Sequence, residues 1–225
     1  MARGRAAGYD GQREAILAQA AALFAQRGWP STSMNEVAAA CGLSKATLYH
    51  YYRDKDALLV EIAEGHVSRL AAMVDAVAAE ALPPQARLHR LIERILAEYA
   101  GAQHAHRVLT EDVRFLRPAD RRRILDQERH VVAAFSGALA EWRPDLQAAQ
   151  MTTPVAMLLF GSINWMFTWL KPQGALGYEA MAPIVWQLLC GGLPAVQAPG
   201  GPAAALPTAP GRQRRAGAAA KVPRT

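Results

Sequence analysis

Helical periodicity constrains this chain more than any other feature of its sequence. Apolar residues recur every three or four positions from one end to the other, while two-residue alternation and Asn-Gly hairpin pairs are missing. The chain is 225 residues long and 52% hydrophobic, which is enough to fill a core without staples. The pattern therefore predicts an all-α fold with about nine helices.

Caps, glycines and prolines place the ends of these helices. Ser33 and Glu36 form a capping box, Ser44 is an N-cap, and Pro83 follows the end of a long helix. Three short helices followed by longer ones predict a small head, residues 10–54, on a body, residues 55–197. The predicted helices lie near residues 10–27, 33–41, 45–52, 55–81, 85–102, 104–115, 120–142, 148–170 and 178–192.

The third short helix carries four consecutive ring-bearing side chains within SKATLYHYYRDK, residues 44–55. At about 100° per residue, Leu48 and Tyr52 share one side of this helix, and Tyr49 and His50 lie on the opposite side with Ala46 between them. A small residue surrounded by flat and hydrogen-bonding groups suits a helix that enters the major groove of DNA. A well-packed aromatic patch is the competing interpretation.

The preceding short helix and its glycine-containing turn complete a predicted helix-turn-helix. Lys45 and Thr47 flank the outward side of the second helix, and the Tyr51 hydroxyl lies at its margin. Lys55 begins the next helix, where an ammonium and free backbone N–H groups can both meet a phosphate.

Residues 13–62 resemble the N-terminal domain of TetR/AcrR-family transcriptional regulators. The resemblance is carried by the elements A-x-x-L-F-x-x-x-G, T-S-x-x-x-V-A-x-x-x-G and L-Y-x-Y-Y-x-x-K-x-x-L. It implies a double-stranded, near-palindromic DNA operator whose sequence stays open. By position, it implies DNA contacts at Ser33, Ser44, Lys45, Ala46, Thr47, Tyr49, His50, Tyr51 and Lys55.

The uncharged segment 151–170 is twenty residues long, which is the length of a membrane span. Thr, Ser and Asn side chains, a proline and a glycine dilute it, no Lys/Arg cluster flanks it, and no second such segment exists. We therefore expect a helix buried between its own core and a second subunit, and no membrane association.

The family resemblance also implies a homodimer whose last two long helices, near 151–170 and 178–192, form a four-helix interface, with a ligand cavity in each body. Residues 160–193 are similar to the C-terminal part of regulators of fatty-acid, phenylacetate and steroid degradation, several of which sense acyl-CoA thioesters. This implies a repressor released by a small apolar or acyl-CoA-type effector. A repressor of an efflux gene that senses lipophilic drugs is the alternative.

An acyl-CoA effector requires an apolar tunnel and cations for its phosphates. Ordinary packing or solvation competes with a ligand role for every candidate residue. The candidates are Arg114, Arg117, Arg121 and Arg122 as cations, Tyr99, Phe160, Trp165 and Phe167 as walls, and Asn164 as a polar contact.

The net charge of +6 lies mostly in residues 198–225, which hold five Lys/Arg and no Asp/Glu. This Pro-, Ala- and Gly-rich segment is predicted to be a disordered basic tail, and residues 1–9 a flexible arm. Phosphate loops, nucleophile elbows and metal-binding patterns are missing, so no catalytic, cofactor or metal site is expected. The same missing motifs lead us to expect that the protein is not an enzyme. Two distant cysteines and an N-terminus without an apolar stretch lead us to expect a cytoplasmic protein.

Overall fold

The computed structural model describes residues 2–170, 174, 176–193 and 196. Within these residues the chain is built of α-helices and one short 3-10 helix, η1, without a strand, so the all-α prediction is confirmed. The expected tail, residues 198–225, lies outside the described part.

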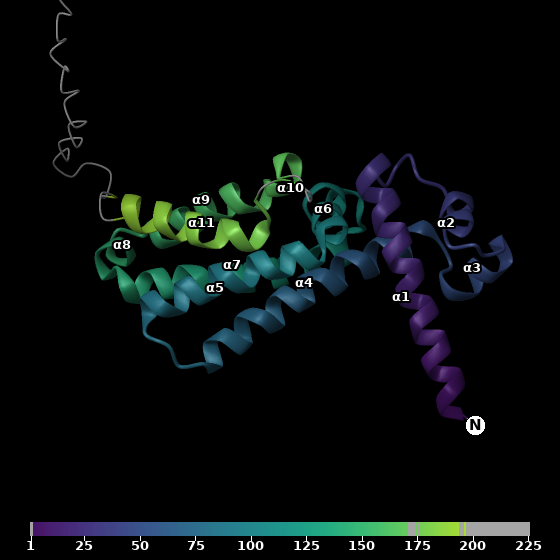
Figure 1. Cartoon of the computed structure of the whole chain (residues 1–225), viewed down its shortest axis with the longest axis horizontal. Coiled ribbons are helices and arrows are strands. Elements are labelled where there is room, and N and C mark those ends of the chain that lie inside the picture. Colours follow the sequence, from purple (N-terminus) through teal and green to yellow (C-terminus); the bar gives the residue numbers. More distant parts are fainter. Residues whose placement is uncertain (1, 171–173, 175, 194–195, 197–225) are drawn as a thin grey trace, which may run out of the picture.

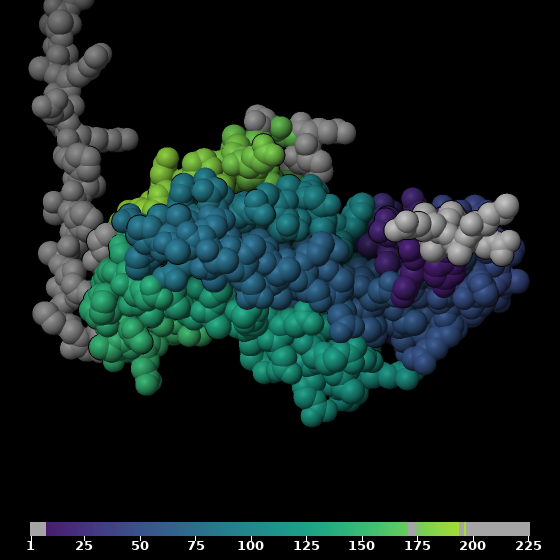
Figure 2. Space-filling view, turned by 90° about the horizontal axis from the view of Figure 1, so that it is seen from below, coloured from purple at the N-terminus to yellow at the C-terminus, as the bar shows by residue number. Residues whose placement is uncertain are grey.

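The helices follow the predicted order through most of the chain. Figure 1 shows α1, α2 and α3 gathered at one end, with α4 running from them along the body formed by α5, α7, α9 and α11. The space-filling view shows the N-terminal residues as one end of an elongated molecule (Figure 2). The elements are α1 (Ala2–Arg27), α2 (Met34–Ala40), α3 (Lys45–Tyr51), α4 (Lys55–Ala79), α5 (Pro84–Gly101), α6 (Gln103–Asp112), η1 (Val113–Phe115), α7 (Pro118–Trp142), α8 (Pro144–Ala148), α9 (Thr152–Asn164), α10 (Met166–Trp169) and α11 (Tyr178–Gly192).

Local sequence signals account for the short helices of the head. The Ser33 hydroxyl accepts from the Glu36 N–H at 3.3 Å, and the Glu36 carboxylate accepts from the Ser33 N–H at 2.7 Å, so the predicted capping box is confirmed. The Ser44 hydroxyl accepts from the Thr47 N–H at 3.1 Å, which confirms the cap of α3. Gly42 has a φ of +65°, a conformation that ends α2 and that favours glycine.

Two expected helix boundaries are wrong. The first helix begins at Ala2 and not near Asp10, because residues 2–9 contain no proline and are dominated by the strong helix formers Ala and Arg. The single helix expected over residues 148–170 is instead divided into α8, α9 and α10.

The first division lies at Gln150, which has a φ of +56°. Pro154 explains it, because a proline ring clashes with the carbonyl four residues earlier in a continuous helix. The second division lies after Asn164, whose carbonyl accepts a hydrogen bond from His106 of α6, while the Thr168 N–H bonds to Trp165. A tertiary contact therefore ends α9, and the sequence alone does not reveal it.

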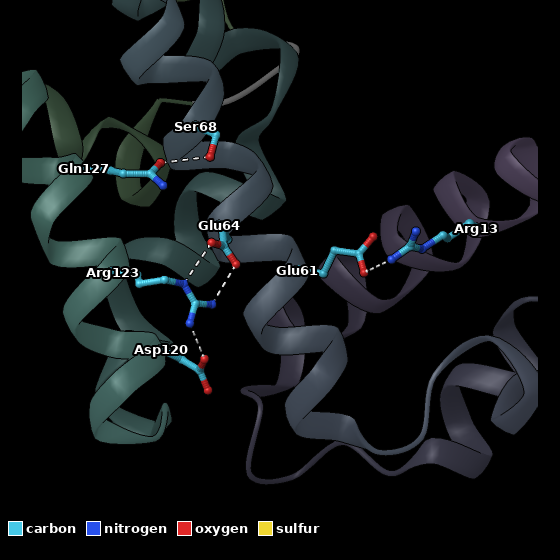
Figure 3. A network of polar contacts seen from close by, with 7 residues as sticks. All are labelled: Arg13, Glu61, Glu64, Ser68, Asp120, Arg123 and Gln127. Atoms are coloured by element: carbon cyan, nitrogen blue, oxygen red, sulfur yellow. Dashed lines mark hydrogen bonds and ion pairs between the residues drawn. The ribbon is translucent and has the colours of Figure 1, made fainter.

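Helix α4 is the element on which both halves pack. It contacts α1 and, along the body, α5, α6 and α7. Figure 3 shows polar contacts on both of its sides. Arg13 of α1 bonds to Glu61 at 2.6 Å, and Arg123 of α7 bonds to Glu64 at 3.1 and 3.0 Å. Exposed pairs of this kind contribute little to stability, so the apolar contacts of α4 hold the two halves together.

Segment 151–170 forms no membrane-length helix. None of the helices in the described ranges is long and apolar enough to cross a membrane.

Candidate nucleic-acid interface and ligand cavity

Helix α3 turns its two sides to different surroundings, as the angular analysis predicts. Leu48 is 0% exposed and Tyr52 is 3% exposed, whereas Tyr49 is 43% exposed and His50 is also exposed. The predicted orientation of α3 is therefore confirmed. Its outward side chains are accessible to a macromolecule that docks at this end of the protein.

Tyr52 anchors α3 to the rest of the head. Its hydroxyl accepts a hydrogen bond from Arg13 Nε at 3.2 Å, and the Arg13 guanidinium lies 5.7 Å from the ring centroid. Burial raises the pKa of Tyr52 to about 12, so the phenol is neutral near pH 7. Because Arg13 also bonds to Glu61 of α4, one guanidinium connects α1, α3 and α4.

The outward side of α3 is polar but carries no acidic residue. The Lys45 ammonium lies 5.9 Å from the centroid of the Tyr49 ring, and the hydroxyls of Ser44 and Thr47 are 2.8 Å apart. Such a surface can donate to phosphates and to base edges. We call the exposed set Lys45, Ala46, Thr47, Tyr49 and His50 the recognition face.

Two predicted DNA-contacting residues lie at the margins of this face. Ser33 is exposed at the start of α2, where its hydroxyl caps the helix. Tyr51 is half-buried because its ring stacks on that of Tyr9, with centroids 4.7 Å apart. Their contacts with DNA stay predictions.

The ammonium of Lys55 is already bound by backbone carbonyls of the head. It donates to the carbonyls of Trp29 at 2.7 Å and Pro30 at 3.2 Å, and it lies 4.3 Å from the centroid of the Trp29 ring. A phosphate contact through this side chain would require it to leave both carbonyls. The predicted contact therefore depends on the backbone N–H groups of α4 or on a rearrangement.

Trp29 joins the head to the body. Its ring stacks on Phe115 of η1, with centroids 5.2 Å apart, and its indole N–H donates to the Lys55 carbonyl at 3.4 Å. Burial raises the pKa of Asp112, at the end of α6, and the backbone N–H of Trp29 opposes this shift. We call Trp29, Lys55, Asp112 and Phe115 the Trp29 joint.

The body contains a largely apolar cavity of about 490 Å³. Its walls come from α4, α5, α6, α7 and α9. The volume lies within the range of small-molecule sites. The lining residues are Val67, Leu70, Tyr99, His106, Leu109, Thr110, Leu125, Glu128, Arg129, Val131, Val132, Ala133, Ser136, Thr153, Met157, Phe160 and Asn164.

A chain of hydrogen bonds runs along one wall of the cavity. The Tyr99 hydroxyl donates to Asn164 Oδ1 at 2.8 Å, and His106 Nε2 lies 3.3 Å from the Asn164 carbonyl. His106 Nδ1 lies 3.4 Å from Nε2 of His66 on α4, whose Nδ1 lies 3.5 Å from an Arg69 nitrogen. Arginine only donates and a carbonyl only accepts, so each imidazole carries its proton on Nε2.

His66 and His106, the two histidines in this series of hydrogen bonds, are neutral near pH 7. Burial lowers the pKa of His66 to about 3, and the charges of His106 and Arg69 act in the same direction. Burial also lowers the pKa of His106 to about 4, although its bond to the Asn164 carbonyl opposes the shift. The wall thus joins the cavity to α4 without a buried charge.

A second hollow of about 680 Å³ lies where the head meets the body, and we call it the junction hollow. It shares Leu109, Thr110, Leu125, Glu128 and Asn164 with the cavity, so the two spaces meet at these residues. Its remaining lining residues are Gly28, Pro30, Glu111, Asp112, Val113, Arg114, Phe115, Arg121 and Trp165.

The structure brings together some of the predicted ligand residues and separates others. Tyr99, Phe160 and Asn164 line the cavity, and Arg114, Arg121 and Trp165 join Asn164 in the junction hollow. Arg117 instead pairs with Asp56 at 3.3 Å, and Arg122 and Phe167 line neither space. The ligand roles of all nine candidate residues stay predictions. Tyr99, Phe160 and Asn164 are better placed for such a role than the other six, because they line the cavity.

Sequence reasoning missed His106 and Glu128 as lining residues. Glu128 stands three positions after Leu125 and four before Val132, so a carboxyl on an apolar stripe was the available signal. His106 had no comparable signal, because its partner His66 is forty positions away in the sequence.

The segment from α9 to α11 leaves large apolar side chains in contact with solvent. Leu158 is 74% exposed and Leu188 is 72% exposed, and Met157, Trp165 and Trp169 are also exposed. Single chains rarely expose so many large apolar groups on neighbouring elements unless a partner covers them. This surface includes the two segments from which the sequence predicts a dimer interface.

Two protein families match the chain, one at each end. Residues 16–62 match the family described as bacterial regulatory proteins, tetR family, and residues 81–193 match the family described as tetracyclin repressor-like, C-terminal domain. A solved TetR-family transcriptional regulator from Bordetella parapertussis 12822 is 32% identical, with a TM-score of 0.77 over 82% of this chain and 97% of that one.

Other similar proteins have named functions. The structure of AibR in complex with isovaleryl coenzyme A and operator DNA is 26% identical, with a TM-score of 0.67 over 79% of this chain and 97% of that one. The HTH-type transcriptional repressor KstR2 of Mycobacterium tuberculosis (strain ATCC 25618 / H37Rv) is 24% identical, covering 82% of this chain and 94% of that protein. KstR2 of Rhodococcus jostii (strain RHA1) is 28% identical, but the match covers only 48% of this chain and 53% of that protein.

The neutral histidine pair predicts acid sensitivity. An unfolded chain binds protons at both histidines below their ordinary pKa of about 6.5, whereas the folded protein resists protonation down to about pH 4 at His106 and about pH 3 at His66. The free energy of unfolding should therefore fall as the pH drops from about 6.5, by on the order of 2 kcal/mol per histidine at pH 5.

Urea denaturation between pH 7.5 and 5 measures this loss. His106→Gln should reduce the pH dependence, and His104→Gln, which changes an exposed histidine on the same helix, should leave it as in the wild type. Equal slopes for all three proteins would contradict a neutral buried pair.

Proposed function

The chain belongs to the TetR family of bacterial regulatory proteins, and from this membership we propose that it represses transcription until an acyl-CoA-type effector removes it from its operator. A ligand-responsive, DNA-binding repressor of this family acts as a homodimer on double-stranded DNA. The observation that carries the proposal is an exposed recognition face and an apolar cavity in one chain, with α4 shared between them.

The recognition face is proposed to enter the major groove. Ala46 allows close approach of the backbone, Tyr49 and His50 reach base edges, and Lys45 reaches a phosphate. In a dimer the two copies of α3 would meet successive major grooves about 34 Å apart, so the operator is near-palindromic. The exposed apolar surface of α9 to α11 is the proposed dimer interface, since pairing would remove Leu158 and Leu188 from water.

Relatives and cavity chemistry both support an acyl-CoA-type effector. AibR was solved with isovaleryl coenzyme A and operator DNA, and the cavity here is apolar enough for an acyl group. The junction hollow continues from the cavity toward Arg114 and Arg121, which suits the phosphates of coenzyme A. A repressor of drug efflux, the alternative from the sequence, is not favoured by these relatives.

Effector binding is proposed to act on the head by two routes. In the cavity the effector would touch Val67 and Leu70 of α4, and in the junction hollow it would lie against Phe115 and Pro30 beside the Trp29 joint. A coupling of only about 1–3 kcal/mol between effector and operator binding would be sufficient for induction.

The organisation of the chain follows from this function. We propose residues 10–54 as the DNA-binding domain and residues 55–197 as the ligand-binding and dimerisation domain. The protein is proposed to act in the cytoplasm, where its operator lies, and to catalyse no reaction.

Tyr49→Ala tests the recognition face. An operator fragment would first be selected from random-sequence DNA with the wild-type protein. Loss of one base-edge contact costs about 1–3 kcal/mol, so affinity for this fragment should fall by about tenfold or more in a fluorescence-anisotropy titration. His130→Ala, an exposed change on α7 of the body, is the control and should bind normally. Unchanged affinity of a folded Tyr49→Ala dimer would reject the assignment of α3.

A thermal-shift screen identifies the effector class. Acyl-CoA thioesters of increasing chain length should raise the melting temperature, because a ligand that binds only the folded state stabilises it. Lipophilic cations serve as the comparison series, since they represent the efflux alternative. The same thioesters should release the protein from its operator. Stabilisation by the cations alone would replace the acyl-CoA proposal with that alternative.

A further inference from the structure

Glu128 of α7 is the one carboxylate that lines both the cavity and the junction hollow. It stands where the polar end of a ligand must lie if its apolar part fills the cavity. Recognition of coenzyme A phosphates by Arg114 and Arg121 gives this residue no role. An anionic side chain is also an unexpected choice at the entrance to a site for an anionic ligand.

The described residues give the Glu128 carboxylate no hydrogen bond and no ion pair, although its neighbours are paired. Glu111 bonds to Arg107 at 3.0 Å, and Arg129, which follows Glu128, bonds to Asp126 at 2.5 Å. Burial raises the pKa of Glu128. A ligand that donates a hydrogen bond to this half-buried carboxylate would replace hydration that burial has already reduced, so the contact is favourable.

Three hydroxyl groups of the cavity wall already donate elsewhere. The Thr110 hydroxyl donates to the His106 carbonyl at 2.9 Å, and the Ser136 hydroxyl donates to the Ala133 carbonyl at 3.2 Å. The Tyr99 hydroxyl donates to Asn164 Oδ1. Glu128 is thus an acceptor in the lining of both spaces, available to a molecule that occupies either of them.

We propose that Glu128 selects effectors whose polar end donates a hydrogen bond at this point and rejects effectors that end there in a carboxylate. The proposal rests on the cavity being the effector site. It explains how the protein would distinguish a coenzyme A thioester from the free acid: the arm of coenzyme A carries amide N–H donors next to the thioester, whereas a free acid places a second negative charge beside Glu128.

Three eight-carbon probes that differ only in their terminal group test the proposal: octan-1-ol, octylammonium and octanoate. The wild-type protein, titrated by ligand-detected NMR, should bind the alcohol and the ammonium at least about tenfold more tightly than octanoate, as expected when one charge-assisted contact is made or opposed. In Glu128→Gln, octanoate should bind about tenfold more tightly and octylammonium about tenfold more weakly than in the wild type.

The controls separate selection by Glu128 from a general change of charge or fold. Glu141→Gln makes the same charge change on α7 at a residue that lines neither space, and it should retain the wild-type order of affinities. Glu128→Leu removes the charge without an amide, and it should also bind octanoate more tightly. Retained operator binding by each variant shows that it is folded.

An unchanged ratio of octanoate to octan-1-ol affinity in both Glu128 variants would overturn the proposal. None of the probes contains coenzyme A. If acyl-CoA thioesters failed to release the protein from DNA, the proposed effector class would be rejected. The binding of the three probes would still show whether Glu128 selects among polar end groups.

Discussion

The contact of Trp29 with both halves of the protein is the constraint on which the rest of the structure depends. This residue lies in the turn between α1 and α2, yet it is bonded to the first residue of α4 and stacked on Phe115 of the body. The head therefore cannot rotate freely about α4, because rotation would separate the stacked rings and free the Lys55 ammonium. The orientation of the recognition face is thus set by the body, and whatever changes the body can change that orientation.

The cavity is placed where such a change can start. Its polar wall runs from Tyr99 and Asn164 through two neutral histidines to α4, and Asn164 also lines the hollow beside Phe115. A buried chain of hydrogen bonds is stable only when every member is satisfied, so a ligand that displaces one member disturbs the others. The same carbonyl of Asn164 that receives His106 also ends α9. The polar wall of the cavity, the path of α9 and the position of α4 are therefore parts of one hydrogen-bonded unit.

The sequence predicts those features that short-range physics decides. The sides of α3 follow from helix geometry applied to Leu48, Tyr49 and Tyr52, and the capping box follows from residues three positions apart. Contacts between distant segments decide the features that were missed. The end of α9 depends on His106, and the ammonium of Lys55 is held by the backbone carbonyl of Trp29, 26 positions earlier. Glu128 could be predicted in part. The sequence shows that it interrupts an apolar stripe, but it does not show that the residue lines two separate spaces.

We infer that, of the two routes, the one through the Trp29 joint carries most of the effect of the effector on DNA binding. The most direct test is the ratio of operator dissociation constants with and without saturating acyl-CoA thioester, measured for the wild type and for Phe115→Ala. We expect a ratio of about tenfold or more for the wild type and a clearly smaller ratio for the variant, each at its own saturating thioester concentration, because the contacts with Val67 and Leu70 of α4 remain. Both should bind the operator equally without thioester. A variant that is released from the operator as fully as the wild type would contradict this inference.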